Sequence, residues 1–260
     1  MLAFARYGLA RELAFRANFL AKVAVEVLWL CIMLAFYHVI FAKTVTVAEW
    51  PREQYLFFLG CFFALEGIVE TFFMSNCAEF ANLVRSGDLD FYLLRPIDAQ
   101  FLITCRDIDW STAPNVLMGF GVMTLALVEM GWVFDPWRAT LFLLLFICGT
   151  ILAYAFMVML TSLSVWMVRN QNLMETWWLF TSLMRYPREM YVGRWATPLG
   201  LFFTFVVPVL LITNVPARTM VKPTNDPLLV FFLVGASLLL FMLSRWFFSF
   251  SLSRYRSASS

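Results

Sequence analysis

Charged residues are scarce in this chain: Asp, Glu, Lys and Arg together make up 14% of its 260 residues. A soluble globular domain carries about a quarter, so the composition excludes a soluble enzyme and a disordered chain. A basic run is also missing and the net charge is only +2, which excludes a nucleic-acid-binding protein. Hydrophobic residues make up 62%, in runs without the alternation of transmembrane β-barrel strands. The sequence therefore predicts an all-α, polytopic helical membrane protein.

Residues that many enzymes need are also rare. The only histidine, His38, lies within an apolar run, which argues against a metal centre or a Ser-His-Asp triad. None of the three lysines, Lys22, Lys43 and Lys222, follows a glycine, so the phosphate-binding pattern GxxxxGK[ST] is absent. The five cysteines form no CxxC pair and fit small apolar packing residues. We therefore expect a non-catalytic chain that holds no metal and no cofactor of its own.

Long apolar runs predict about six transmembrane helices, since each crossing needs about 20 apolar residues. Arginines alternate with apolar residues over 1–18, which predicts an amphipathic helix at the membrane surface. The remainder, 19–260, is expected to form a single transmembrane domain. Five of the predicted spans cover about 19–42, 54–75, 110–130, 139–168 and 227–250.

The fifth span in chain order has two alternatives. The run at 171–186 is short for a span, whereas 198–215 is long enough but lies in a proline-rich stretch, and proline kinks helices. Either 198–215 spans cleanly, or 171–186 spans and 187–216 forms a re-entrant element, which needs protein or water to satisfy its backbone. Both alternatives place the two termini on one side. Most Lys and Arg residues then fall on that side, which predicts cytoplasmic termini, although this bias weakens if Arg185, Arg188 and Arg194 lie outside.

Acidic residues within apolar runs are candidates for a translocation path. Glu66 and Glu70 lie four residues apart in the second predicted span, so they share one helix face. Charges in lipid are costly and usually face a bundle interior or water. A polar path and a structural hydrogen-bonded pair both remain open, and no basic residue in mid-span is expected to pair with these acids. With Phe62 and Phe63 of the same run, they are the candidate residues of a translocation path.

The segment 81–101, ANLVRSGDLDFYLLRPIDAQF, is the strongest local pattern. Its order predicts a turn, a short amphipathic helix and a stop, because Ser and Asp favour caps and proline ends a helix. The mixed apolar and charged face suits a docking element for another protein as well as a loop against lipid headgroups. The candidate coupling residues are Arg85, Gly87, Asp88, Asp90, Leu93, Leu94, Arg95 and Pro96.

The string SGDLDFYLLRP resembles a segment in permease subunits of bacterial ABC transporters of the type-2 exporter class. The amphipathic N-terminal stretch, Tyr186-Pro187, Pro208 and Val215-Pro216-Ala217 add to this resemblance. It implies a six-span permease whose ATPase is a separate subunit. It further implies that residues 1–17 form a connecting helix at the inner surface and that 85–97 sit in a groove of the ATPase.

The resemblance also implies the partners and the location. Two permeases and two nucleotide-binding ATPases would form the working unit in a bacterial inner membrane, with ATP and Mg²⁺ in the ATPase. The second permease would be a copy of this chain or a paralogue. The alternative function is a self-sufficient secondary transporter or channel that uses Glu66 and Glu70. A membrane-embedded lipid enzyme and a purely assembling subunit are the remaining classes.

Overall fold

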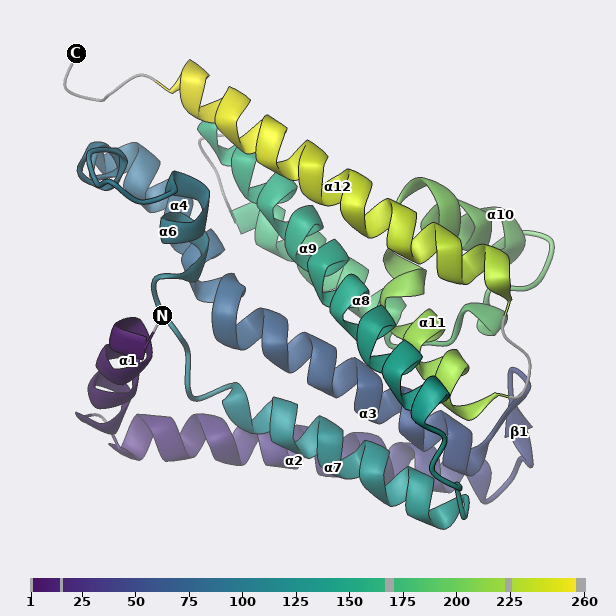
Figure 1. Ribbon diagram of the computed structural model, residues 1–260. Coiled ribbons are helices and arrows are strands. Elements are labelled where there is room, and N and C mark those ends of the chain that lie inside the picture. Colours follow the sequence, from purple (N-terminus) through teal and green to yellow (C-terminus); the bar gives the residue numbers. More distant parts are fainter. Residues whose placement is uncertain (1, 15, 167–170, 223–225, 256–260) are drawn as a thin grey trace.

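The computed structural model describes residues 2–14, 16–166, 171–222 and 226–255 (Figure 1). The all-α prediction is confirmed, because helices dominate and a single short hairpin, β1 (Thr46–Val47) with β2 (Trp50–Pro51), supplies the strands found in these residues. Within the described residues, four helical stretches are long and apolar enough to cross a bilayer, and a fifth results if one bent pair counts as a span. The four stretches are Arg16–Phe41, Arg52–Ser86, Pro136–Val165 and Pro227–Arg254.

The second of these stretches is one long helix with a local irregularity. It comprises α3 (Arg52–Val69), the π-helical turn η1 (Glu70–Met74) and α4 (Ser75–Ser86). The predicted span 54–75 lies inside it, but the helix continues to Ser86 because η1 absorbs the irregularity without a break. The predicted span 19–42 lies in α2 (Arg16–Phe41), and α1 (Leu2–Ala14) precedes it. The surface helix expected over 1–18 therefore ends at Ala14, and Arg16 already belongs to α2.

Two Asp-Pro pairs encode the starts of two long helices. Asp135 accepts hydrogen bonds from the backbone N–H groups of Trp137 and Arg138, and so caps α8 (Pro136–Ser162), which η2 (Leu163–Val165) extends. Asp226 caps α12 (Pro227–Arg254) in the same way. Proline suits the first helical position because it lacks only an N–H that has no partner there. The predicted spans 139–168 and 227–250 lie on these helices, although residues 167 and 168 are outside the described part.

The region around the fifth predicted span is broken. Helix α9 (Gln171–Met184) covers the run at 171–186, and η3 (Arg188–Met190) follows. The clean span at 198–215 is wrong: α10 (Ala196–Leu201) and the π-helical η4 (Phe202–Val206) meet α11 (Val209–Val221) at 86°. The break lies at Val207-Pro208, where proline cannot donate a backbone hydrogen bond.

The helices lie side by side and give the molecule two distinct ends (Figure 1). One end holds α1, α4, α5 (Leu89–Leu93), α6 (Ala99–Cys105) and the C-terminal end of α12. The opposite end, called the hairpin end here, holds β1, β2, the end of α7 (Ala113–Glu129) and the start of α8. Exposed Trp137 at the hairpin end and exposed Trp246 near the other end fit the two aromatic belts of a membrane protein.

Helix α3 forms the centre of the core and is buried along most of its length. It packs closely on α7, the helix at the predicted span 110–130, because glycines face each other across the contact. A Cβ atom added at Gly60 would lie 2.8 Å from the carbonyl oxygen of Gly119. Small residues at such crossings let the backbones approach closely. The outer surface of α2 is apolar, with Leu28 and Phe36 exposed, as expected for a helix that faces lipid.

Candidate functional site

The predicted coupling segment forms a compact projection at the α4–α6 end. Gly87 terminates α4 with a φ of +81°, a left-handed conformation that favours glycine. The chain then turns into α5, and Leu89 is fully buried against the inner cluster that includes Phe80, Ile103 and Phe248. This buried leucine fixes the position of the projection relative to α4, α6 and α12.

Four apolar side chains project from this base and form what we call the apolar tip. Leu94 is 83% exposed and Phe91 is 68% exposed, although both lie close in sequence to the buried Leu89. The apolar tip consists of Phe91, Leu93, Leu94 and Ile97. Pro96 is exposed beside it. The predicted apolar pair Leu93 and Leu94 therefore points outward, and Phe91 and Ile97 of the same predicted segment lie with it.

The charged candidates surround the apolar tip. The Ser86 hydroxyl donates to the Asp88 carboxylate over 2.7 Å, and Arg85 donates to the side chain of Asn82. The Arg95 guanidinium lies 5.1 Å from the centre of the Tyr92 ring. Asp90 lies on the first turn of α5, beside the tip. The structure therefore brings the eight candidates together on one projection.

Asp98 joins this projection to the last long helix. Its carboxylate accepts a hydrogen bond from the Phe101 backbone N–H over 3.0 Å and so caps α6. The same carboxylate pairs with Arg245 of α12. The Arg245 guanidinium and the capping N–H together hold the pKa of Asp98 below its ordinary value. Asp98 lies in the segment that the sequence singled out, but its pairing with Arg245 was not predicted, although a lone Arg within the last apolar run was a visible signal.

The predicted path residues lie in the interior of the chain, not on a surface. Phe62, Phe63 and Glu66 are buried within α3, and Glu70 is partly buried in η1. They are therefore covered within this chain in this conformation, and their place on a translocation path stays a prediction. The reason is the crossing of α3 with α7 and α11, which covers the face that carries them.

A basic residue does reach this interior, which corrects the expectation that none would. The guanidinium of Arg185, directly after α9, lies 5.6 Å from the centre of the Phe62 ring and 5.3 Å from that of Trp29. Phe62 and Glu66 share one face of α3. The side chain thus brings a positive charge into the region where the buried acids lie.

Asn115 links the acids to the neighbouring helices. Its Nδ2 donates to Glu26 of α2 over 2.9 Å and to Glu70 over 3.3 Å. One amide on α7 therefore connects α2 with η1. This geometry favours a structural role for Glu70, as a hydrogen-bonded partner of Asn115, over a role in a continuous polar path.

A comparison with protein families decides the class. The family described as ABC-2 family transporter protein matches residues 27–259. The chain belongs to the ABC-2 transporter family. The resemblance read from the sequence is thereby confirmed, and the chain is a multi-pass permease subunit of an ABC transporter. Searches among curated proteins and among solved structures give no match.

In this ABC-2 permease, the matched range contains both the coupling segment and the buried acids, while α1 lies outside it. Among the described residues, no three His, Cys, Asp or Glu side chains gather so that they could hold a metal ion. The sequence also has no phosphate-binding loop. What the chain offers is a contact surface for another molecule: a projection with an apolar tip, fixed at its base to long apolar helices.

Proposed function

We propose that this ABC-2 permease is an exporter subunit of a bacterial inner membrane, driven by ATP hydrolysis in a separate nucleotide-binding subunit. In this proposal, residues 85–97 dock into the ATPase. The observation that carries it is the apolar tip. Large apolar side chains clustered beside charges on a polar end of a membrane protein indicate a site for a protein partner.

The base of the projection supports transmission of movement. Leu89 packs with Phe80 of α4 and Phe248 of α12, and Asp98 pairs with Arg245 of α12. A displacement of the tip is therefore passed to two long helices instead of being absorbed by a loose loop. ATP binding in the partner then biases the bundle between two arrangements.

The proposed topology places the α4–α6 end in the cytoplasm, where ATP is available. Helix α9 is then a short fifth span, and α10, η4 and α11 form a re-entrant element at the outer side. With α2, the α3–α4 helix, α7, α8 and α12, this makes six passes. A second permease, either a copy of this chain or a paralogue, completes the unit, and ATP with its Mg²⁺ binds the ATPase.

The test is co-purification of the chain with its partner from native membranes in mild detergent. The wild-type chain is expected to bring down a P-loop ATPase that mass spectrometry identifies. Leu94→Asp places a charge in the centre of the tip and is expected to reduce recovery of that ATPase at least about tenfold, the loss for one buried interface anchor. Val192→Asp, at an exposed apolar residue of the opposite end, is the matched control and should retain it.

Two further outcomes complete this test. Exchanging the charges of Asp90 and Arg95 should leave the chain inserted but abolish transport driven by the ATPase. Full recovery of the ATPase with Leu94→Asp would contradict docking through the tip. If the folded wild-type chain brings down no ATPase, the exporter proposal fails and a self-sufficient transporter using Glu66 and Glu70 takes its place.

A further inference from the structure

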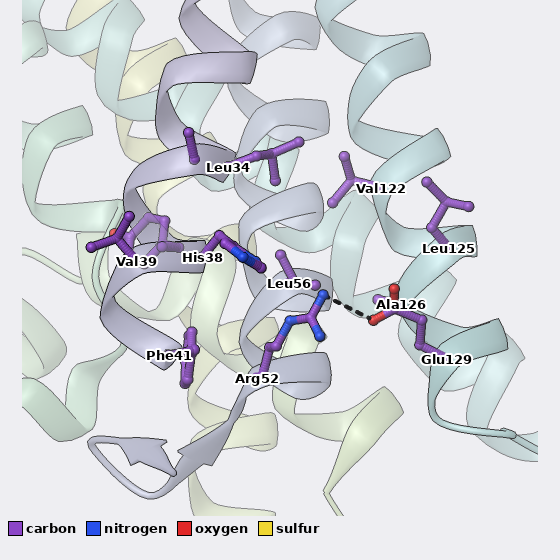
Figure 2. Close-up of a pocket in the computed structure, with 12 residues that line it drawn as sticks. Leu34, His38, Val39, Phe41, Arg52, Leu56, Val122, Leu125, Ala126 and Glu129 are labelled. Atoms are coloured by element: carbon purple, nitrogen blue, oxygen red, sulfur yellow. Dashed lines mark ion pairs between the residues drawn. The ribbon is translucent and has the colours of Figure 1, made fainter. Parts of the chain in front are cut away.

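A groove lies between α2, α3 and α7 near the hairpin end (Figure 2). Its volume is about 470 Å³, which falls within the range of about 300–1,000 Å³ for small-molecule sites. The coupling segment and the buried acids do not contribute to its lining. The apolar walls are Leu34 and Phe41 of α2, Leu56 of α3, and Val122, Leu125 and Ala126 of α7.

The polar residues of the groove gather at one end of it. Arg52 is the first residue of α3 and Glu129 is the last residue of α7, so both lie where these helices leave the apolar layer. Exposed Phe134 and Trp137 in the following turn mark the same level as an interface. His38 points from α2 into the space between the helices (Figure 2). The groove is thus apolar along its length and charged at the level of the lipid headgroups.

Arg52 and Glu129 form an exposed ion pair at this end of the groove (Figure 2). The guanidinium Nη2 and the carboxylate Oε2 are 3.8 Å apart, which is longer than a hydrogen bond. Their side chains are 45% and 47% exposed. A long, exposed ion pair at the end of an apolar groove leaves both groups able to bond a ligand that itself carries an anion and a cation next to a hydrocarbon chain.

We propose that this groove binds one phospholipid with a phosphate and a primary ammonium in its headgroup, namely phosphatidylethanolamine. The phosphate contacts Arg52, with His38 beside it, and the ammonium contacts Glu129. One acyl chain lies between α2 and α7. In the topology proposed above, this lipid comes from the outer leaflet. The inference requires that the chain spans a bilayer, as its family shows, and does not depend on coupling to an ATPase.

The weak packing of α2 gives this lipid a structural consequence. Helix α2 buries only Leu30, Met33 and Tyr37 among its described side chains. An acyl chain between α2 and α7 adds apolar contact where the protein alone supplies little. The bound lipid is therefore expected to raise the thermal midpoint of the purified chain, as any ligand that binds only the folded state does.

Native mass spectrometry of the purified chain, titrated with dioleoyl phosphatidylethanolamine or dioleoyl phosphatidylglycerol, tests the proposal. The wild type should bind one phosphatidylethanolamine in preference to phosphatidylglycerol. Arg52→Gln should weaken binding of both lipids about tenfold, the value of one charge-assisted hydrogen bond. Glu129→Gln should remove the preference and leave phosphatidylglycerol binding intact. Arg138→Gln, at the same end but outside the lining of the groove, should change neither.

A variant that fills the groove separates lipid binding from other uses of this surface. Ala35 lines the groove, so Ala35→Trp should abolish the specific lipid adduct. Leu28 is exposed nearer the N-terminal end of α2 and outside the groove, so Leu28→Trp should not. Stronger binding of phosphatidylglycerol than of phosphatidylethanolamine by the wild type would overturn the headgroup assignment. Unchanged lipid adducts in Ala35→Trp, or a loss of permease dimers without a loss of lipid, would overturn the site itself.

Discussion

Arg245 of α12 pairs with Asp98, the residue that caps α6, although 147 positions of the chain separate them. The pair connects the base of the coupling segment to the last long helix. It does so on the surface, where an ion pair contributes only about 0.2–1 kcal/mol to stability. In the proposed coupling mechanism, its role is to fix the direction in which a movement of the segment is passed to α12.

The first prediction concerns the pH dependence of this pair. The pKa of Asp98 is lowered by Arg245 and by the capping N–H group of Phe101. A carboxyl group whose pKa is lower in the folded state contributes its full stability above the unfolded pKa, about 3.9, and loses it as the pH falls through the folded pKa. Thermal midpoints of wild type and Asp98→Asn should differ slightly at pH 7 and converge in acid.

Asp88→Asn is the control for this measurement, because Asp88 contacts Ser86 and not Arg245. It should follow the wild type at every pH. The contradicting result is a wild type that is less stable than Asp98→Asn at pH 7 and gains stability relative to it as the pH falls. The ionised form of Asp98 would then destabilise the fold, and the pair would have no tethering role.

The second prediction concerns the close crossing of α3 and α7. A Cβ atom at Gly119 would meet the backbone of Ala64 and of Gly60, neither of which can move aside like a side chain. Gly119→Ala should therefore destabilise the folded chain by about 1–3 kcal/mol, the usual cost of overpacking. The measurement is the thermal midpoint of the detergent-solubilised protein, followed by size-exclusion chromatography.

Gly121→Ala is a matched control on the same helix. A Cβ atom there meets nothing within 4 Å, so the substitution gains helix propensity without a clash. It should be neutral or stabilising by up to about 1 kcal/mol. Equal destabilisation by both variants would mean that α7 does not cross α3 at Gly119.

Features of the fold that depend on neighbouring residues could be predicted from the sequence. Helix starts at Asp135-Pro136 and Asp226-Pro227, and the turn at Gly87, follow from signals within a few residues, so they could be predicted. The apolar runs likewise predict the long helices, because length and composition alone decide them. For the region around Val207-Pro208 the sequence allowed two structures and could not decide between them, since proline is compatible with either a kinked span or a re-entrant element.

Contacts between distant segments could not be predicted. The approach of Arg185 to Phe62 depends on where α9 ends relative to α3. The bridge from Asn115 to Glu26 and Glu70 depends on the crossing of three helices. The burial of Phe62 and Phe63 has the same origin: an aromatic run in a membrane helix has the same composition whether it faces lipid, a partner or the core.

The third prediction concerns Glu189, which joins three elements at the hairpin end. Its carboxylate accepts from Trp50 over 3.1 Å, from Asn214 over 3.0 Å and from Arg218 over 2.6 Å. Glu189→Ala leaves these donors unpaired and Arg218 largely buried without its anion. The expected cost is about 2–4 kcal/mol of unfolding free energy, measured as a lower thermal midpoint. Glu129→Gln, which loses only a 3.8 Å contact, should change stability by less than about 1 kcal/mol in the same detergent.

The same residue gives a pH test. Burial alone would raise the pKa of Glu189, but hydrogen bonds from its own N–H, Asn214 and Trp50 hold that pKa below its ordinary value. The stability gained from the ionised form is therefore present above about pH 4.3 and is lost as the pH falls through the folded pKa. The difference between wild type and Glu189→Gln should shrink accordingly in acid. A constant difference from pH 7 down to the acid limit would contradict this assignment.

The fourth prediction concerns the orientation of the chain in the membrane. Arg194 lies in the exposed turn before α10, toward the proposed outer side, whereas Ser86 ends α4 at the proposed cytoplasmic side. Arg194→Cys should react with a membrane-impermeant maleimide added to intact cells. Ser86→Cys should react only after the membrane is made permeable. Cys61, Cys77 and Cys105 are buried, but Cys31 is exposed and Cys148 is partly exposed, so both variants are made in a background that carries Cys31→Ser and Cys148→Ser.

The labelling result decides whether residues 85–97 can reach an ATPase in the cytoplasm. If Ser86→Cys reacts in intact cells and Arg194→Cys does not, the coupling segment faces away from cellular ATP, and an ATPase could not reach the apolar tip. If both react only in permeable membranes, the α10–α11 element opens to the cytoplasm and the chain has one crossing fewer before it. Reaction of Arg194→Cys alone in intact cells is the pattern that the short α9 span and a re-entrant α10–α11 element require.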